Sequence, residues 1–459
     1  MPSLLVLDVV GLTPAHLGPS TPHLTALARE GFVAELRPVL PAVTCTVQST
    51  FLTGLLPRDH GIVANGWCFR ELAEVWLWRQ SNRLVSGEKV WERARRHRPG
   101  LTTAKLFWWY NMGSSAEIAV TPRPAYFADG RKLPDIYTQP ASLRRELQDE
   151  LGPFPLFRFW GPGADIASTD WIGRAAERVI EKERPDLALV YLPHLDYDLQ
   201  RYGPSFDGLD RALAEVDAVA GRLIAKARSL DMEVIVLSEY GTTRATGSVS
   251  INRLLRREGF LAVVDALNGE LLDPAGSRAF AVADHQLAHV YVRDAEDVDP
   301  VRRLLESMDG VDLVLDDDGK RSYGLDHPRS GELVCVAAPE RWFDYIYWLD
   351  DRRAPDFART VEIHRKPGYD PLELLLDPKL RFARGRIAWK LFKKSLGFRT
   401  LLDVIPLDTS LVRGTHGRLP DRPEDGPLVI ASSRTHASER FEATEIAELI
   451  LATLLGSKT

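Results

Sequence analysis

The feature that most constrains the fold of this chain is a series of short apolar segments that alternate with amphipathic ones. "SLLVLDVV" (3–10), "DLALVYLP" (186–193) and "MEVIVLSEYG" (232–241) contain few polar residues before their last positions. Such runs are typical of strands buried on both faces, as in a parallel sheet covered by helices. The sequence therefore predicts an α/β fold in which a mostly parallel sheet lies between helices.

The segments between these runs have the apolar spacing of helices. Residues 168–185 place Ile172, Ala176 and Val179 on one stripe, and the helix expected at 21–31 begins with Thr-Pro and ends at a glycine. Further helices are expected at 87–100, 207–230 and 442–455.

The alternation is not equally clear along the whole chain. Residues 265–345 are richer in strand-forming residues, and residues from about 346 to 412 fit the alternation poorly. A chain of 459 residues can bury a large core. We expect a single catalytic domain over residues 1–459, with an insertion at about 346–412.

Composition excludes several classes of protein. The net charge of −6 gives no overall field that favours a nucleic acid polymer. Three cysteines argue against a disulfide scaffold and for a reducing compartment, so a cytoplasmic location is expected. The opening "MPSLLVLDVVG" is interpreted as a buried strand rather than a signal peptide, and no run of about 18 apolar residues suggests a membrane span.

Carboxylates follow the predicted strands where ligands usually bind. Asp8, Asp196 and Glu239 lie at or just beyond three strand ends, and His416 lies between glycines in "RGTHGR". In open α/β sheets, ligands bind beyond the carboxyl ends of the strands. Each residue alone has a plain reading as a turn, capping or loop residue, but together they are ligands that suit divalent cations.

A helix start in "LPAVTCTVQST" completes this group. Thr44 lies at its first turn, where free backbone N–H groups and the helix dipole attract phosphate. On its own Thr44 is more simply a helix cap. Beside metal ligands, its hydroxyl is a candidate nucleophile for phosphoryl transfer.

These motifs resemble the alkaline phosphatase superfamily, and within it the nucleotide pyrophosphatase/phosphodiesterase (type I phosphodiesterase) family. The resemblance rests on the strand ending in Asp8 and on "PAVTCTVQSTFLTGLLPRDHGIVAN" (41–65). It continues through "YLPHLDYDLQRYGP", "LSEYG" and "GTHG". It implies an alkaline-phosphatase-like core that hydrolyses phosphate esters, with a covalent phosphothreonine forming at Thr44.

The resemblance also implies two metal positions. The first would use Asp8, Thr44 and the pair Glu239-Tyr240, which stands where the family has Asp-His. The second would use Asp196, Gln200 in place of a family histidine, and His416. The expected ions are two divalent metals, zinc or manganese, with magnesium or calcium as alternatives because oxygen groups replace two histidines.

The substitutions leave alternatives open. One metal site could be lost, or His194, His285 or His289 could supply a missing ligand. His194 would share a face with Asp196 in an extended segment. The family's Pro-Asn is Thr46-Val47 here, which makes Gln48 a substitute for the phosphate-binding asparagine. Gln48, Asn65 and His194 are therefore the candidate substrate-binding residues.

The expected function is metal-dependent hydrolysis of a small phosphate ester, most simply a phosphodiester or nucleotide pyrophosphate bond. Alternatives are a phosphomonoesterase or phosphonate hydrolase of the same superfamily, or a degenerate member that only binds anions. Residues 381–399 mix basic and aromatic side chains. They predict either peripheral contact with an anionic membrane or a lipid-like substrate, or a solvated helix packed on the core.

Overall fold

The core of the protein is a nine-stranded sheet with the order β23-β2-β22-β11-β1-β10-β5-β6-β9. The computed structural model describes residues 2–128 and 131–456. In sheet order the strands are Arg440–Glu442, Phe32–Arg37, Leu428–Ala431, Met232–Leu237, Ser3–Val9, Leu187–Leu192, Thr103–Leu106, Ile118–Pro122 and Ile136–Gln139. Strands β11, β1, β10, β5 and β6 run parallel, whereas β22 and β9 run antiparallel to their neighbours. The predicted α/β class with a mostly parallel sheet is confirmed.

The central strand β1 sets the position of the site. Leu4, Leu5, Val6 and Leu7 are fully buried, as expected for a strand covered on both faces. Asp8 pairs in register with a residue near the end of β10 on one side and with the last residue of β11 on the other. Its carboxylate therefore lies where three parallel strands end.

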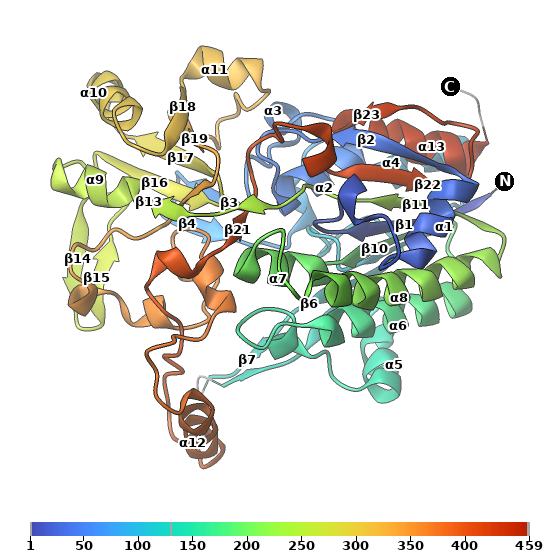
Figure 1. Cartoon of the computed structure of the whole chain (residues 1–459), viewed down its shortest axis with the longest axis horizontal. Coiled ribbons are helices and arrows are strands. Elements are labelled where there is room, and N and C mark those ends of the chain that lie inside the picture. The colour runs from blue at the N-terminus through green and yellow to red at the C-terminus, as the bar shows by residue number, and fades with distance from the viewer. Residues whose placement is uncertain (1, 129–130, 457–459) are drawn as a thin grey trace.

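Helices cover both faces of this sheet (Figure 1). One face carries α1 (Pro22–Glu30), α6 (Ile166–Glu183) and α8 (Leu209–Arg228), and α5 (Ser142–Leu151) packs beside α6. The other face carries α2 (Thr44–Thr53), α4 (Val90–His97) and α13 (Ile446–Leu455), and α3 (Pro57–His60) follows α2. The helices predicted from apolar spacing are confirmed.

A second, antiparallel sheet lies beyond the carboxyl ends of the first. Its order is β16 (Ala279–Asp284), β17 (Leu287–Val292), β19 (Leu333–Ala337) and β18 (Val311–Leu315). Helices α9 (Ile251–Arg257), α10 (Ala295–Glu306) and α11 (Asp317–Ser322) surround it at the left of Figure 1. This sheet accounts for the strand-rich composition of residues 265–345.

Short strand pairs join these parts. They are β3 (Gly66–Phe69) with β4 (Glu74–Leu77), β7 (Ala125–Tyr126) with β8 (Lys132–Leu133), β12 (Thr243–Arg244) with β21 (Gly414–Thr415), β13 (Gly247–Val249) with β20 (Arg341–Phe343), and β14 (Val263–Ala266) with β15 (Gly269–Leu272). Helix α7 (His194–Tyr202) follows β10 directly.

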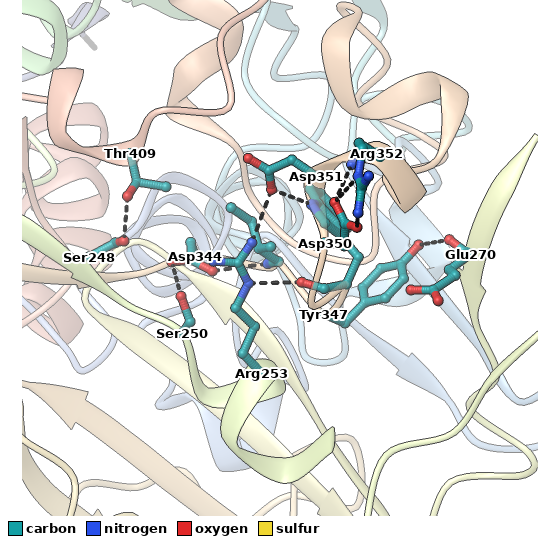
Figure 2. Close-up of polar contacts among 12 residues, drawn as sticks. Ser248, Ser250, Arg253, Glu270, Asp344, Tyr347, Asp350, Asp351, Arg352 and Thr409 are labelled. Carbon is teal, nitrogen blue, oxygen red and sulfur yellow. Dashed lines mark hydrogen bonds and ion pairs between the residues drawn. The ribbon is translucent and has the colours of Figure 1, made fainter. Parts of the chain in front are cut away.

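Residues 346–412 are mostly irregular, with short 3₁₀ turns and one helix, α12 (Ala383–Ser395). Figure 2 shows how the start of this segment is held. Arg253 of α9 donates to the backbone oxygen of Trp348 at 2.8 Å and to Asp351 at 3.2 Å. Ser250 donates to Asp344 at 2.6 Å. Within the described part of the chain, no helix has the length and apolar content needed to cross a bilayer.

Candidate active site

The start of α2 is fixed by a contact from the second sheet. Asn65 accepts a hydrogen bond from the backbone N–H of Cys45 at 2.9 Å and donates its own amide to Asp284 at 3.1 Å. The backbone N–H of Asn65 also donates to Asp284, at 2.7 Å. Asn65 was a candidate for binding substrate, and the structure places it as the residue that holds the helix start.

Thr44 is the first residue of α2, and its side chain is buried. Its hydroxyl lies 3.3 Å from the phenol oxygen of Tyr240, which follows β11. Burial raises the pKa of Glu239 well above its usual range, and the Thr44 hydroxyl is one of the groups that act in the opposite direction. The candidate nucleophile therefore lies beside both residues of the Glu239-Tyr240 pair.

Gln48, one helical turn after Thr44, links two carboxyl groups. Its Nε2 donates to Asp8 at 3.1 Å and to Glu239 at 2.7 Å. Its Oε1 accepts the backbone N–H of Trp109 at 2.8 Å. Because a backbone N–H can only donate, this contact fixes the amide orientation and directs the NH₂ group at the carboxyl pair.

The carboxyl pair is deeply buried, and this changes its protonation. Burial raises the pKa of Asp8 to about 7, and hydrogen bonds from Glu239 and Gln48 oppose the shift. For Glu239, burial and the proximity of Asp8 both raise the pKa. Burial and the nearby second carboxyl therefore both favour the protonated form of Glu239, because two buried carboxyl groups cannot easily carry charge together.

A second cluster begins at Asp196 on α7. Gln200 donates to Asp196 Oδ2 at 2.7 Å and accepts the hydroxyl of Tyr369 at 2.8 Å. Burial raises the pKa of Asp196 to about 7. Asp196 Oδ1 accepts no hydrogen bond from the described residues and lies 3.9 Å from Nε2 of His416.

His416 connects the two clusters. Its Nδ1 lies 2.9 Å from the backbone oxygen of Ala42, which can only accept, so Nδ1 carries the proton. Burial lowers its pKa well below the usual range, and the neutral ring therefore keeps a lone pair on Nε2. The ring of Tyr240 stacks on it, with centroids 3.5 Å apart and planes 7° from parallel.

His285 comes from the turn between β16 and β17. Its ring lies 3.8 Å from that of His416 and 3.7 Å from that of Tyr369. Its Nδ1 is 2.7 Å from Asp284, and its buried Nε2 has no hydrogen-bond partner among the described residues. Its φ of +57° is a conformation that side chains rarely adopt, and such strain is concentrated at functional sites.

These residues fit the two-metal arrangement only in part. The Asp196 and His416 atoms are 3.9 Å apart, a separation that two ligands of one ion can have when each bond is about 2.0–2.2 Å. The Asp8 and Glu239 carboxyls already share the amide hydrogens of Gln48, which repel a cation. In residues 2–128 and 131–456, no three His, Cys, Asp or Glu side chains group as a metal site. At the expected first position, Gln48 therefore occupies one oxygen of each carboxyl, whereas Asp8 Oδ1 and Glu239 Oε2 have no hydrogen-bond partner among the described residues.

Most of the predicted site residues come together. They are Asp8, Thr44, Gln48, Glu239, Tyr240, Asp196, Gln200 and His416. The expectation for His194 was wrong about its conformation, because residues 194–202 are helical rather than extended. Its Nε2 contacts Glu215 of α8 at 3.0 Å. His289 lies 3.1 Å from the backbone oxygen of Val63.

Tyr369 was not predicted. Its backbone N–H donates to the backbone oxygen of Ala283 at 2.9 Å. In the same segment, the buried Lys366 pairs with Asp370 and Glu373, each at 2.7 Å. The sequence signal was the run "HRKPGYD", in which a lysine and an aspartate bracket the tyrosine. Nothing local shows that this run reaches Gln200, because the contact joins distant parts of the chain.

Comparisons with known proteins identify the family of the chain. The family model for type I phosphodiesterase/nucleotide pyrophosphatase matches residues 4–370. The chain belongs to the type I phosphodiesterase/nucleotide pyrophosphatase family. The match covers the central sheet except for β22, β23 and the first residue of β1, and it covers every site residue except His416.

Two curated relatives of this type I phosphodiesterase family member show the extent of the likeness. An uncharacterised pyrophosphatase/phosphodiesterase of Schizosaccharomyces pombe is 28% identical over 246 residues, covering 51% of this chain and 42% of the relative. Human ectonucleotide pyrophosphatase/phosphodiesterase family member 1 is 24% identical over 252 residues, covering 52% and 23%. The matched stretch thus spans less than half the length of these relatives.

Solved structures share the fold over almost the whole chain. Murine ectonucleotide pyrophosphatase/phosphodiesterase 5, in an inactive form in complex with AMP, has a TM-score of 0.60 at 15% identity and covers 100% of this chain and 96% of its own. Phosphonoacetate hydrolase from Sinorhizobium meliloti 1021, in complex with phosphonoformate, has a TM-score of 0.62 at 15% identity, covering 99% and 96%. The alkaline-phosphatase-like fold predicted for the family member is confirmed.

Proposed function

We propose that the protein hydrolyses a phosphodiester or nucleotide pyrophosphate bond, with Thr44 as the attacking group. The observation that carries this proposal is the position of the Thr44 hydroxyl. It lies at the first turn of α2, 3.3 Å from Tyr240 and beside the Asp8–Glu239 pair. Family membership supports the reaction class.

The residues of the site suit the steps of such a reaction. The Thr44 oxygen attacks phosphorus, and its proton passes to the Asp8–Glu239 pair, whose single negative charge accepts it. As the bond from Thr44 to phosphorus forms, the bond from phosphorus to the leaving oxygen breaks, and the leaving group takes up a proton from solvent. Water then attacks phosphorus, the bond to Thr44 breaks, a phosphomonoester is released, and the threonine oxygen regains its proton from the carboxyl pair. The first turn of α2 faces the phosphoryl oxygens with backbone N–H groups.

Divalent metal dependence is general in this family, and the identity and number of ions are part of the proposal. We place one ion, zinc or manganese, at Asp196 and His416. There a bound ion would supply positive charge to the phosphoryl oxygens. The second predicted ion, at Asp8 and Glu239, has less support because Gln48 donates to both carboxyls.

Detection of a covalent adduct on Thr44 tests the proposed mechanism most directly. Wild type, Thr44→Ala and Thr44→Ser are assayed on bis-p-nitrophenyl phosphate and a nucleotide panel with manganese or zinc. Loss of a nucleophile lowers kcat by about a thousandfold or more, so Thr44→Ala is expected at background and Thr44→Ser in between. Intact-mass analysis after acid quench is expected to show one added p-nitrophenylphosphoryl or nucleoside-monophosphoryl group in wild type and none in Thr44→Ala.

Thr53→Ala is the matched control, because Thr53 is another buried threonine of α2, and its hydroxyl bonds only backbone groups, Ser49 O and Leu55 N–H, in the described contacts. Equal turnover by wild type and Thr44→Ala would rule out Thr44 as the nucleophile. Turnover of phosphomonoesters or phosphonates, with none of diesters, would favour the corresponding branch of the superfamily.

A second candidate is a non-catalytic member that binds an anion. It is favoured by one specific observation, the occupation of the carboxyl pair by the amide of Gln48. Absence of turnover by wild type on the whole panel, together with retained binding of AMP, would make this the better assignment.

A further inference from the structure

The charge of residues 378–402 differs from that of the rest of the chain. This segment has eight basic residues and no acidic one, although the whole chain carries a net charge of −6. The basic residues are Lys379, Arg381, Arg384, Arg386, Lys390, Lys393, Lys394 and Arg399. Such a cluster is attracted to surfaces of negative charge.

Helix α12 forms the centre of this segment, and only one of its faces is attached to the body. Ile387 packs against a cluster that includes Trp342 and Ile405. Arg386 pairs with Asp403 at 3.0 Å, and Lys390 donates to the backbone oxygen of Leu401 at 2.7 Å. These contacts define the inner face of the helix.

The opposite face is apolar and exposed. Phe382 just before the helix is 90% exposed, Trp389 on the helix is 57% exposed, and Leu396 just after the helix is 59% exposed. Trp389 lies two residues from Ile387 and therefore on roughly the opposite side of the helix. These three apolar side chains, which follow one another at intervals of seven residues, are called the stripe below. Phe398, in the next turn of chain, is 62% exposed. Figure 1 shows α12 at the tip of an arm, clear of both sheets.

We propose that residues 379–402 bind the surface of an anionic lipid bilayer, with Phe382, Trp389 and Leu396 entering the headgroup region. A helix packed on the core, the plain alternative from the sequence, would bury these side chains, and the structure leaves them in water. An apolar stripe with tryptophan, flanked by lysine and arginine and free of acidic residues, is the pattern of helices that lie in a membrane interface. This inference does not depend on hydrolysis.

The test is flotation of the full chain with lipid vesicles. Vesicles of phosphatidylcholine alone are compared with vesicles that contain about one-quarter phosphatidylserine, at low and high salt. Wild type is expected to float only with the anionic vesicles, and less at high salt. Trp389→Ser with Leu396→Ser is expected to weaken binding at least tenfold, and Lys393→Glu with Arg399→Glu likewise.

Matched controls distinguish binding through residues 379–402 from non-specific binding by exposed aromatic or basic side chains elsewhere. Phe157→Ser removes an aromatic that is 59% exposed elsewhere, and Arg145→Glu with Arg174→Glu changes the same charge on α5 and α6. Both controls are expected to bind vesicles as wild type does. No flotation of wild type at low salt, or equal flotation of the stripe variant, would overturn the proposal. The proposal would also be overturned if wild type bound no vesicles and instead self-associated with rising concentration, and if Trp389→Ser with Leu396→Ser abolished that self-association.

Discussion

At the scale of single residues, Gln48 is the most consequential side chain in the site. Its three hydrogen bonds hold Asp8 and Glu239 together and tie both to the backbone of Trp109. Without the Gln48 amide, the buried carboxyl groups of Asp8 and Glu239 would each lose a hydrogen-bond donor. A buried polar group that loses its hydrogen-bond partner lowers the free energy of unfolding, and the loss is larger when the group is charged.

Gln48→Ala is therefore expected to lower the free energy of unfolding by about 2–4 kcal/mol. With the amide gone, the carboxyl pair becomes open to a cation. Manganese is expected to raise the Tm of Gln48→Ala by several degrees more than that of wild type. Thermal unfolding with and without manganese measures both effects.

Gln139→Ala is the control, because Gln139 donates to a backbone oxygen and touches no carboxyl group in the described contacts. It should lower Tm without any rescue by manganese. A Gln48→Ala variant as stable as wild type, or one that manganese does not help, would contradict the role given to the amide.

At the scale of elements, α2 is positioned by α3 as well as by Asn65. His60 at the end of α3 lies 3.0 Å from the Thr50 hydroxyl, and its Nδ1 accepts the backbone N–H of Ile62 at 3.0 Å. Because Nδ1 accepts from Ile62, that contact needs a neutral ring, and Nε2 carries the proton that it donates to the Thr50 hydroxyl. Burial lowers the pKa of His60 to about 3 in the folded chain.

This predicts a pH dependence of stability with a definite sign. Below pH about 6.5 the unfolded chain binds a proton at His60 that the folded chain does not, so stability falls as the pH falls. Between pH 7 and pH 5 the contribution amounts to about 2 kcal/mol. Wild type should lose that much more than His60→Gln in urea unfolding. The exposed His97→Gln is the control, and equal losses in wild type and His60→Gln would refute the assignment.

Elements and site differ in how far the sequence predicts them. The apolar runs and helical stripes predict the central strands, since burial on both faces leaves a local pattern. Asp8, Thr44 and Glu239 were found because strand ends and a helix start bring them to one edge. Tyr369, the turn at His285 and the hold of Asn65 on Cys45 were not, because they depend on contacts between distant segments.

At the scale of the whole molecule, the site lies between the two sheets. Asp8 lies on β1, Glu239 follows β11, Asp196 lies on α7 after β10, and His285 lies in the hairpin of the second sheet. In the described part of the chain, the Asp196 and His416 atoms that lie 3.9 Å apart have no hydrogen-bond partner, and the Gln48 amide donates to neither residue.

Elemental analysis of protein equilibrated with excess manganese or zinc is therefore expected to give about one tightly held ion per chain. Asp196→Ala should release it, whereas Asp198→Ala, two positions away on the same helix, should retain it. Two tightly held ions in wild type would show that the metal position at Asp8 and Glu239 is also occupied, with the Gln48 amide displaced.

The bridge from Cys45 through Asn65 to Asp284 has a consequence for how the chain can be divided. The helix that presents the candidate nucleophile starts correctly only when a hairpin more than two hundred positions later is in place. A fragment that ends before that hairpin would keep the parallel strands β1, β5, β6, β10 and β11 but would lose β22, β23 and the restraint on the first turn of the helix. Gene truncation or recombination at a point between residues 65 and 284 would thus separate the start of α2 from the hairpin that restrains it.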